Sequence, residues 1–266
     1  MKNQILSHFT TECPWRDTLY WYNTIDSTNT QGKRLAQDGA PHGTVLIAGS
    51  QMGGRGRLGR RFSSPDKMGV YLSVVLRPNC APDALMHLTC AAAVATCKAV
   101  EAVAKLSPSV KWTNDLIYGK KKLGGILTEL SLNGKTGLVD YAVVGIGINC
   151  LQKAEDFPPE LREIATSIGQ LSEQTCSPAK LSAALTESLY QMDQMLLTQK
   201  AQLMADYRSR CMTLGKKISI VRGDAVEHAT ALDLDEDGGL IVQFADGRVQ
   251  TVRSGEVSVR GMYGYV

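Results

Sequence analysis

The chain has 266 residues, which is enough for one large domain with a small one or for two medium ones, and it can bury a core without disulfides. Apolar residues make up 44% and charged residues 21%, a composition that is typical of globular proteins and excludes a disordered chain. The net charge is only +3, and no apolar run approaches the roughly 20 residues that cross a membrane.

The start of the chain, MKNQILSHFTTECPWRD, lacks the long apolar stretch of a secretion signal. We therefore expect a cytoplasmic protein that does not act at a membrane. The seven cysteines are odd in number, scattered, and never form a Cys-x-x-Cys pair, so they favour neither a disulfide framework nor a zinc ribbon. We expect most of them to be reduced thiols that fill the core, and no pattern marks one as a nucleophile.

Strand and helix patterns alternate along the first hundred residues. β-Branched and aromatic residues predict strands over 19–25, 43–50 and 70–77. Between the first two strands, cap residues ahead of a short amphipathic run predict a helix that stops at Gly39. An Ala-rich stretch with few charges predicts a long buried helix over 84–104.

Three consecutive strand patterns follow, over 109–119, 122–132 and 136–150. The last two are joined through Asn133-Gly134, and both of these residues tolerate positive φ. This dipeptide predicts a hairpin with a type I′ turn.

The rest of the chain changes in character twice. DFPPE at 156–160 interrupts regular structure, and residues 178–210 have the apolar spacing of one long helix. Short strand patterns then recur every ten or so residues with Gly and Asp turns between them, which predicts a small β-barrel of about 50 residues. We place the boundary near Leu214, which divides the chain into domains 1–213 and 214–266.

The most unusual stretch is SQMGGRGRLGRRFSSP, residues 50–65, which contains four arginines, four glycines and no acidic residue. It carries a charge of +4 in a chain whose net charge is +3, so the remaining residues sum to −1. Charge confined to one loop argues against a broad nucleic-acid-binding face and favours a local pocket for a small anion.

Known phosphate-binding motifs do not explain this loop. Residues 54–59, GRGRLG, match the dinucleotide fingerprint G-x-G-x-x-G, but a strand follows where that motif needs a helix. A Walker A loop is excluded because Gly59-Arg60-Arg61 stands where Gly-Lys-Ser/Thr is required. Glycines that allow close backbone approach and arginines that fork onto phosphate oxygens still predict a mobile loop that closes over an anionic intermediate. A solvated hairpin tip is the alternative.

A second candidate segment is KWTNDLIYGKKKLGGILTEL, residues 111–130. Asn114 and Asp115 stand at a strand junction, and three lysines at 120–122 follow. The pair Gly124-Gly125 lies inside a strand, where glycine often marks the close approach of a ligand. A charged turn is the alternative for the three lysines.

Together these segments resemble the biotin protein ligases, enzymes that attach biotin to a lysine of biotin carboxyl carrier domains. The resemblance covers nearly the whole chain and rests on DSTNT (26–30), QMGGRGRLGRRF (51–62), KWTNDLIYGKKKLGG (111–125), GIGIN (145–149) and the small C-terminal β-domain. It implies an α+β fold in which helices flank a central mixed or antiparallel sheet, with a C-terminal SH3-like β-barrel.

The resemblance also implies a set of site residues. Ser27, Thr28 and Gln51 correspond to residues that hydrogen-bond the rings of biotin, with Asn29 beside them. Ser27, Thr28 and Asn29 also read as an N-cap cluster. The others are Gly54, Arg55, Gly56, Arg57 and Arg60 in the adenylate-binding loop, Lys122 as the catalytic lysine, Gly125 against biotin, and Asn114, Asn149 and Phe62 near the nucleotide.

The implied reaction has two steps. Biotin's carboxylate attacks the α-phosphate of ATP to give biotinyl-adenylate and pyrophosphate, with Mg²⁺ bridging the ATP phosphates, and the carrier lysine then attacks the adenylate and expels AMP. A catalytic role is implied for Lys122, Arg55, Arg57 and Arg60, which neutralise developing charge. Arg57 is the residue expected to retain the labile adenylate.

Two departures from the family pattern and one open role accompany this interpretation. Thr113 stands where the family often has proline. Phe62 stands where it often has tryptophan, and a phenyl ring offers adenine less area and no N–H. Asp115 either orients the incoming amine or simply ends a strand.

Other functions remain as alternatives. Lipoate and octanoate ligases resemble this fold, and a nucleic-acid-binding or protein-binding module could be built from an Arg-Gly loop and a β-barrel. We expect no DNA binding, because about 18 residues precede the first predicted strand, too few for the winged helix-turn-helix that many of these ligases carry. The sequence leaves the target carboxylase open, and also the choice between a monomer and a homodimer.

Overall fold

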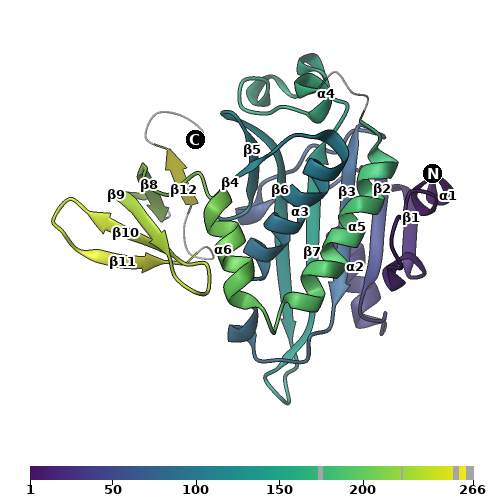
Figure 1. The fold of residues 1–266 in the computed structure, drawn as a ribbon, viewed down its shortest axis with the longest axis horizontal. Coiled ribbons are helices and arrows are strands. Elements are labelled where there is room, and N and C mark those ends of the chain that lie inside the picture. Colours follow the sequence, from purple (N-terminus) through teal and green to yellow (C-terminus); the bar gives the residue numbers. More distant parts are fainter. Residues whose placement is uncertain (173–175, 223, 254–257, 262–266) are drawn as a thin grey trace.

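A computed structural model describes residues 1–172, 176–222, 224–253 and 258–261 (Figure 1). Its central element is a seven-stranded mixed sheet in the order β1-β2-β3-β7-β6-β5-β4. β1 and β2 are parallel, and the other neighbouring pairs are antiparallel. The strands are β1 (Leu19–Ile25), β2 (Thr44–Gln51), β3 (Gly69–Leu76), β4 (Ser109–Lys111), β5 (Asp115–Tyr118), β6 (Lys121–Leu132) and β7 (Val139–Asn149).

Helices cover both faces of this sheet (Figure 1). On one face α3 (Leu88–Ala104) and α5 (Pro178–Met195) pack side by side, and α6 (Lys200–Arg210) packs on α3. On the other face lies α2 (Thr28–Gln37). Because both faces are covered, β3 is buried along its whole length, which explains its continuous apolar sequence. The predicted α+β architecture is confirmed.

Shorter elements connect these layers. These are the short helices α1 (Lys2–Leu6) and α4 (Ile168–Leu171) and five 3-10 turns, at Pro14–Arg16, Arg57–Gly59, Pro82–Leu85, Ala154–Asp156 and Pro159–Leu161. The interruption of regular structure predicted for 156–160 is confirmed, since only two short turns lie there.

The predicted buried helix is α3, which begins at Leu88 because a separate 3-10 turn occupies Pro82–Leu85. Taken together, Pro82–Ala104 has the length and apolar composition of a membrane-crossing helix, with a mean hydropathy of 1.2. However, 67% of its most apolar window is buried inside the fold. Packing against the sheet and α5 accounts for this apolar sequence, as expected of a core helix.

The last part of the chain forms a five-stranded antiparallel sheet in the order β11-β10-β9-β8-β12. Its strands are β8 (Lys217–Arg222), β9 (Ala225–Leu234), β10 (Leu240–Phe244), β11 (Val249–Val252) and β12 (Ser258–Gly261). The small C-terminal β-domain is thereby confirmed, while the division into 1–213 and 214–266 stays a prediction. The two sheets are joined by side chains, among them Trp112, whose Nε1 donates to Gly238 O at 2.8 Å.

Two predicted elements are each divided in the structure. The pattern over 109–119 forms two strands, β4 and β5, because the backbone between them bonds elsewhere: Trp112 N donates to Thr213 Oγ1, and Thr113 O accepts from Tyr207. The single helix predicted over 178–210 is also wrong. It breaks between α5 and α6, where the carbonyl of Leu196 accepts from the ring of His87 at 2.9 Å.

The hairpin between β6 and β7 is confirmed, but the type I′ turn is wrong. The connection is longer than two residues, since Asn133 N donates to Leu138 O at 2.9 Å, and the residue with positive φ is Gly137. The side-chain oxygen of Asn133 accepts from the backbone N–H groups of Lys135 and Thr136. Asn133 therefore stabilises the loop through its side chain rather than through a left-handed backbone.

Candidate active site

A cavity of about 670 Å³ is bounded by the start of α2, the end of β2, the arginine-rich loop after it, and strands β4 to β7. The predicted residues that line it are Ser27, Thr28, Asn29, Gln51, Arg55, Gly56, Arg57, Arg60, Phe62, Asn114, Lys122, Gly125 and Asn149. Segments separated by more than a hundred residues in the sequence thus meet around one space.

Gly54 belongs to the predicted set but, within the described structure, does not line the cavity. Its carbonyl accepts from Phe62 N at 3.0 Å. A Cβ on Gly54 would lie 2.3 Å from Phe62 O and 2.7 Å from Ser64 Oγ, too close for any side chain. The structure gives Gly54 a packing role, in which it lets the two arms of the loop come together.

The end of the cavity near α2 is a preformed polar network. Thr28 donates from both its backbone N–H and its hydroxyl to Gln51 Oε1, at 2.9 and 3.1 Å, and Gln51 Nε2 donates to Ser64 Oγ at 2.8 Å. Ser27 occupies the N-cap position of α2 with an extended backbone, yet its side chain makes no capping bond. Ser27 and Thr28 are both buried, and both line the cavity.

The arginine-rich loop is a closed hairpin rather than an open coil. Gly56 N donates to Arg60 O at 2.7 Å, and Arg55 and Arg61 form a β-bridge. Leu58 and Gly59 at the tip both have positive φ, so the turn reverses tightly. One short turn follows and then the chain enters β3, so the exclusion of a dinucleotide-binding helix is confirmed.

Arg57 connects this loop to the opposite wall of the cavity. Its Nη1 donates to Asn114 Oδ1 at 3.0 Å. Burial lowers the pKa of Arg57, and the nearby Asp115 carboxylate acts in the opposite direction. A guanidinium keeps its charge even so, which leaves a partly desolvated cation facing the cavity.

Lys122 also lines the cavity and is held by Asp115. The Lys122 Nζ and Asp115 Oδ1 atoms are 2.6 Å apart, and both side chains are mostly shielded from solvent. Asn114 Nδ2 donates to Ile126 O at 3.0 Å, which fixes the amide that receives Arg57. A Cβ on Gly125 would lie 3.3 Å from Lys122 Nζ, so this glycine leaves space for the ammonium group.

The three adjacent lysines have different environments. Lys120 is exposed, and Lys121 donates to Arg162 O from the surface, whereas Lys122 reaches the cavity. The backbone of Lys122 is also pinned, since its N–H donates to Ile164 O at 2.7 Å and its carbonyl accepts from Thr166 N at 2.9 Å. A charged turn therefore describes the first two lysines, and a site residue describes the third.

The far wall is shaped by β7. Phe62 packs edge-on against Tyr71 with ring centroids 6.4 Å apart, and its ring fills the space over Gly147, where a Cβ would lie 2.5 Å away. Asn149 is buried and donates to Thr166 O at 2.9 Å. Because Gly145 and Gly147 of GIGIN have no side chain, they leave room at the cavity wall for Asn29 and Phe62.

Several lining residues were not singled out from the sequence. Lys111 and Trp112 stand in the quoted KW element, and Gly145 and Gly147 in GIGIN, so a signal for them existed. The apolar wall formed by residues 157–165 had no such signal, because its contribution depends on a turn that folds back along β6.

These walls suit a ligand with a polar head, an apolar body and an anionic tail. Hydroxyl and amide groups gather at the α2 end, apolar side chains of Ile126 and Leu127 lie along β6, and cationic groups of the loop and Lys122 face the other end. In the part of the chain that the structure describes, no three His, Cys, Asp or Glu side chains gather as a metal site.

Comparison with known proteins agrees with this geometry. Residues 21–149 match the model of the biotin/lipoate A/B protein ligase family, and residues 213–260 match the biotin protein ligase C-terminal domain. A bifunctional ligase/repressor BirA from Bacillus spizizenii is 30% identical over 242 residues, which cover 91% of this chain and 74% of the relative. A biotin–[acetyl-CoA-carboxylase] ligase from Mycobacterium tuberculosis is 31% identical over 237 residues, which cover 87% and 85%.

A solved structure shows the same architecture. The biotin protein ligase from Aquifex aeolicus, in complex with biotin and ATP, superimposes with a TM-score of 0.78 at 28% identity. The match covers 91% of this chain and 98% of that one. With its polar and cationic cavity, its two matched segments and these relatives, the chain belongs to the biotin protein ligase family.

Proposed function

We propose that the protein is an ATP-dependent biotin protein ligase that makes biotinyl-adenylate and transfers the biotinyl group to a lysine of a biotin carboxyl carrier domain. The observation that carries this proposal is the arrangement of one cavity, in which a fixed polar end faces a cluster of loop arginines and Lys122. A weak acid with a polar ring system and a nucleotide phosphate would meet at the junction of the two.

Biotin occupies the polar end in this proposal. The hydroxyls of Ser27 and Thr28 and the amide of Gln51 bond its ring system, while Asn29 closes the site and the backbone at Gly125 lies against it. The network that already orients Thr28 and Gln51 supports this assignment, because preorganised groups lose little entropy on binding.

The nucleotide occupies the cationic end. Arg55, Arg57 and Arg60, with Gly56 in the loop backbone, bind its phosphates, and Phe62, Asn114 and Asn149 line its base and ribose. Mg²⁺ would enter bound to the ATP phosphates as MgATP and would reduce their negative charge.

Chemistry then proceeds in two displacements. A carboxylate oxygen of biotin forms a bond to the α-phosphorus as the bond to pyrophosphate breaks. The carrier amine next attacks the acyl carbon, the bond to AMP oxygen breaks, and the amine loses a proton. Lys122 and Arg57 reduce the repulsion between the two reacting anions in the first step.

The direct test is incubation with biotin, MgATP and a carrier domain, followed by intact-mass measurement of the carrier. We expect an ATP-dependent gain of one biotinyl group, lost when the carrier's acceptor lysine is changed to arginine. Lipoate and octanoate run in parallel test the related ligases. Transfer of those acids without transfer of biotin contradicts the proposal.

The absence of DNA binding and a cytoplasmic location stay predictions, while the target carboxylase and the choice between a monomer and a homodimer stay open. A salt-dependent binding assay with DNA and RNA tests the nucleic-acid alternative. Sedimentation with and without biotin and MgATP tests the oligomeric state.

A further inference from the structure

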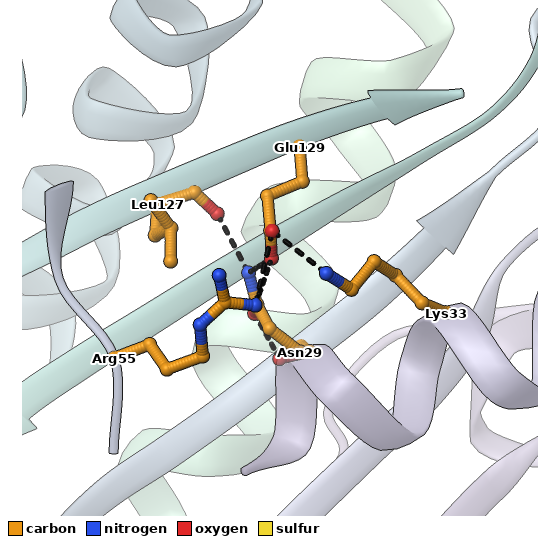
Figure 2. Close-up of polar contacts among 6 residues, drawn as sticks. Asn29, Lys33, Arg55, Leu127 and Glu129 are labelled. Atoms are coloured by element: carbon orange, nitrogen blue, oxygen red, sulfur yellow. Dashed lines mark hydrogen bonds and ion pairs between the residues drawn. The ribbon is translucent and has the colours of Figure 1, made fainter. Parts of the chain in front are cut away.

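Glu129 on β6 is not among the residues that line the cavity, but its carboxylate contacts side chains from two other segments, α2 and the arginine-rich loop (Figure 2). Asn29 Nδ2 donates to Glu129 Oε2 at 3.1 Å, and Lys33 Nζ donates to Oε1 at 2.8 Å, both from α2. Arg55 Nη1, from the arginine-rich loop, lies 3.1 Å from Oε1 and 3.4 Å from Oε2. One carboxylate therefore joins the sheet, the helix and the loop.

The contact with Arg55 ties the loop to the central sheet. Figure 2 shows the Arg55 side chain extending from the loop across the strands to Glu129. The guanidinium is 44% exposed and Glu129 is 21% exposed, so the pair is partly shielded from water. This ion pair therefore anchors the glycine- and arginine-rich loop to strand β6.

The contact with Asn29 fixes the orientation of an amide in the cavity wall. Asn29 Nδ2 donates both to Leu127 O and to Glu129, and its Oδ1 lies 2.7 Å from the buried hydroxyl of Ser73. A flipped amide would place its oxygen against two acceptors, so Glu129 and Leu127 together select one orientation. Space for the amide comes from Gly145, where a Cβ would lie 1.8 Å from Asn29 Oδ1.

The charge of Glu129 suits this role. Burial acts to raise its pKa, but hydrogen bonds from Lys33 and Asn29 and the charges of Lys33 and Arg55 outweigh burial, so the pKa is lowered. The carboxylate is therefore ionised at neutral pH, where it can hold two cations at once.

We propose that Glu129 is a positioning residue for biotin activation, which holds Arg55 and the arginine-rich loop over the cavity and locks the Asn29 amide beside the biotin position. This inference rests on the proposed ligase function. Glu129 touches neither substrate, so its effect passes through Arg55 and Asn29.

The first test needs no activity. Trypsin cleaves after arginine, so cleavage at Arg55, Arg57, Arg60 and Arg61 reports whether the substrate-free loop is held. In Glu129→Gln the side chain keeps its size and loses its charge, and we expect loop cleavage about tenfold faster, as read from fragment masses. Equal cleavage in Glu129→Gln and wild type overturns the inference.

A matched control is Asp140→Asn. Asp140 also lies on the central sheet, on β7, and pairs at 3.5 Å with Arg77, which also donates to Ala36 O and Ala40 O at the C-terminal end of α2. The Asp140→Asn variant also loses one carboxylate charge from an ion pair, and its loop should be cleaved at the wild-type rate. Glu129→Asp, which keeps the charge, should restore part of the protection.

The second test is biotin-dependent exchange of pyrophosphate into ATP. For Glu129→Gln we expect KM for biotin to rise about tenfold, because the loop and the Asn29 amide must be ordered before biotin is enclosed, and KM for ATP to rise as well, because Arg55 of the same loop is assigned to its phosphates. A merely structural role would lower the active fraction without moving KM, so an unchanged KM for biotin overturns the positioning role. If wild type shows no exchange with biotin, the proposed function fails, while the protease result still decides whether Glu129 holds the loop.

Discussion

At the scale of single residues, the ion pair with Asp115 fixes the ammonium group of Lys122, which we propose takes part in catalysis. The ammonium lies 2.6 Å from the carboxylate, and both backbone groups of Lys122 are paired with the segment 164–166. A flexible lysine is thereby held in one place, which reduces the entropy it would lose on binding the transition state. The role of Asp115 is then to orient Lys122, a third option besides orienting the amine or ending a strand.

We predict that Lys122→Ala lowers the rate of biotin-dependent pyrophosphate exchange by about 10²–10³-fold, because a buried cation at the reacting phosphate is removed. Lys121→Ala is the matched control. Its ammonium contacts Arg162 O at the surface, so its loss should leave the rate unchanged. Near-normal exchange by Lys122→Ala contradicts the assigned role.

The ionisation of Glu129 gives a pH prediction. Its pKa is lowered in the folded protein, so the carboxylate adds stability above the unfolded pKa of about 4.3 and this stability is lost as the pH falls through the folded pKa. We expect wild type to exceed Glu129→Gln in free energy of unfolding by about 1 kcal/mol at pH 7, and the difference to shrink below pH 4. Urea titrations at pH 7, 5 and 3.5 measure it. A difference that stays constant with pH contradicts the assignment.

At the scale of elements, the arginine-rich loop joins a tight tip to an inward-facing side chain. The tip is set by the positive φ of Leu58 and Gly59, and Arg57 directly before it reaches Asn114 across the cavity. A contact between the loop and the turn before β5 can keep the cavity closed over an intermediate while the carrier docks.

For Arg57→Gly we predict that adenylate still forms but escapes, since the link to Asn114 and one phosphate-binding cation are both lost. The expected result is indiscriminate biotinylation of lysines on an added bystander protein, together with slower transfer to the carrier. Mass spectrometry of the bystander measures it. Target selectivity equal to that of wild type refutes the retention role.

The glycines of β7 offer a prediction in which two neighbouring changes affect different substrates. A Cβ on Gly147 meets the Phe62 ring at 2.5 Å, and one on Gly145 meets Asn29 Oδ1 at 1.8 Å. If Phe62 contacts adenine, Gly147→Ala raises KM for ATP about tenfold and leaves KM for biotin nearly constant, and Gly145→Ala does the reverse. Steady-state pyrophosphate exchange separates the two constants, and equal effects on both substrates contradict the division of the cavity.

These elements also show what a sequence can and cannot reveal. Strands β1 to β3 were predicted within a residue or two, because continuous β-branched runs reflect local preference and burial together. The break after β4 was not, since Trp112 and Thr113 bond to residues a hundred positions away. The end of α5 was also not predicted, because it depends on a hydrogen bond from the ring of His87, a residue far away in the sequence, to the carbonyl of Leu196.

The residues of the candidate site could likewise be predicted only in part from the sequence. Motif residues such as Lys122 and Gln51 could be assigned from the resemblance, and the structure places them around one cavity. Glu129 was not found, because a glutamate in an ordinary strand pattern carries no local signal. Its importance appears only when Arg55 and Asn29, distant in sequence, are brought to it by the fold.

At the scale of the whole molecule, Trp112 links the C-terminal sheet to the cavity. Trp112 lines the cavity, and its Nε1 donates to Gly238 O in the turn between β9 and β10. That turn is rigid, because Asp235 Oδ1 accepts from Gly239 N at 2.7 Å and Asp237 N at 2.9 Å. A shift of the small sheet would therefore move an aromatic wall of the active site.

We predict that Trp112→Phe destabilises the protein by about 1–2 kcal/mol beyond the loss of area, because the buried Gly238 carbonyl is left without its donor. Trp21→Phe is the matched control, since the Nε1 of Trp21 donates to Asn23 Oδ1 at the surface, where water can replace it. Urea unfolding monitored by circular dichroism gives both values. Because Gly238 also has a φ of 82° and lies against Cys90, Gly238→Ala should cost more than Trp112→Phe. If Trp112→Phe is no less stable than Trp21→Phe, the two sheets are joined by contacts other than this bond.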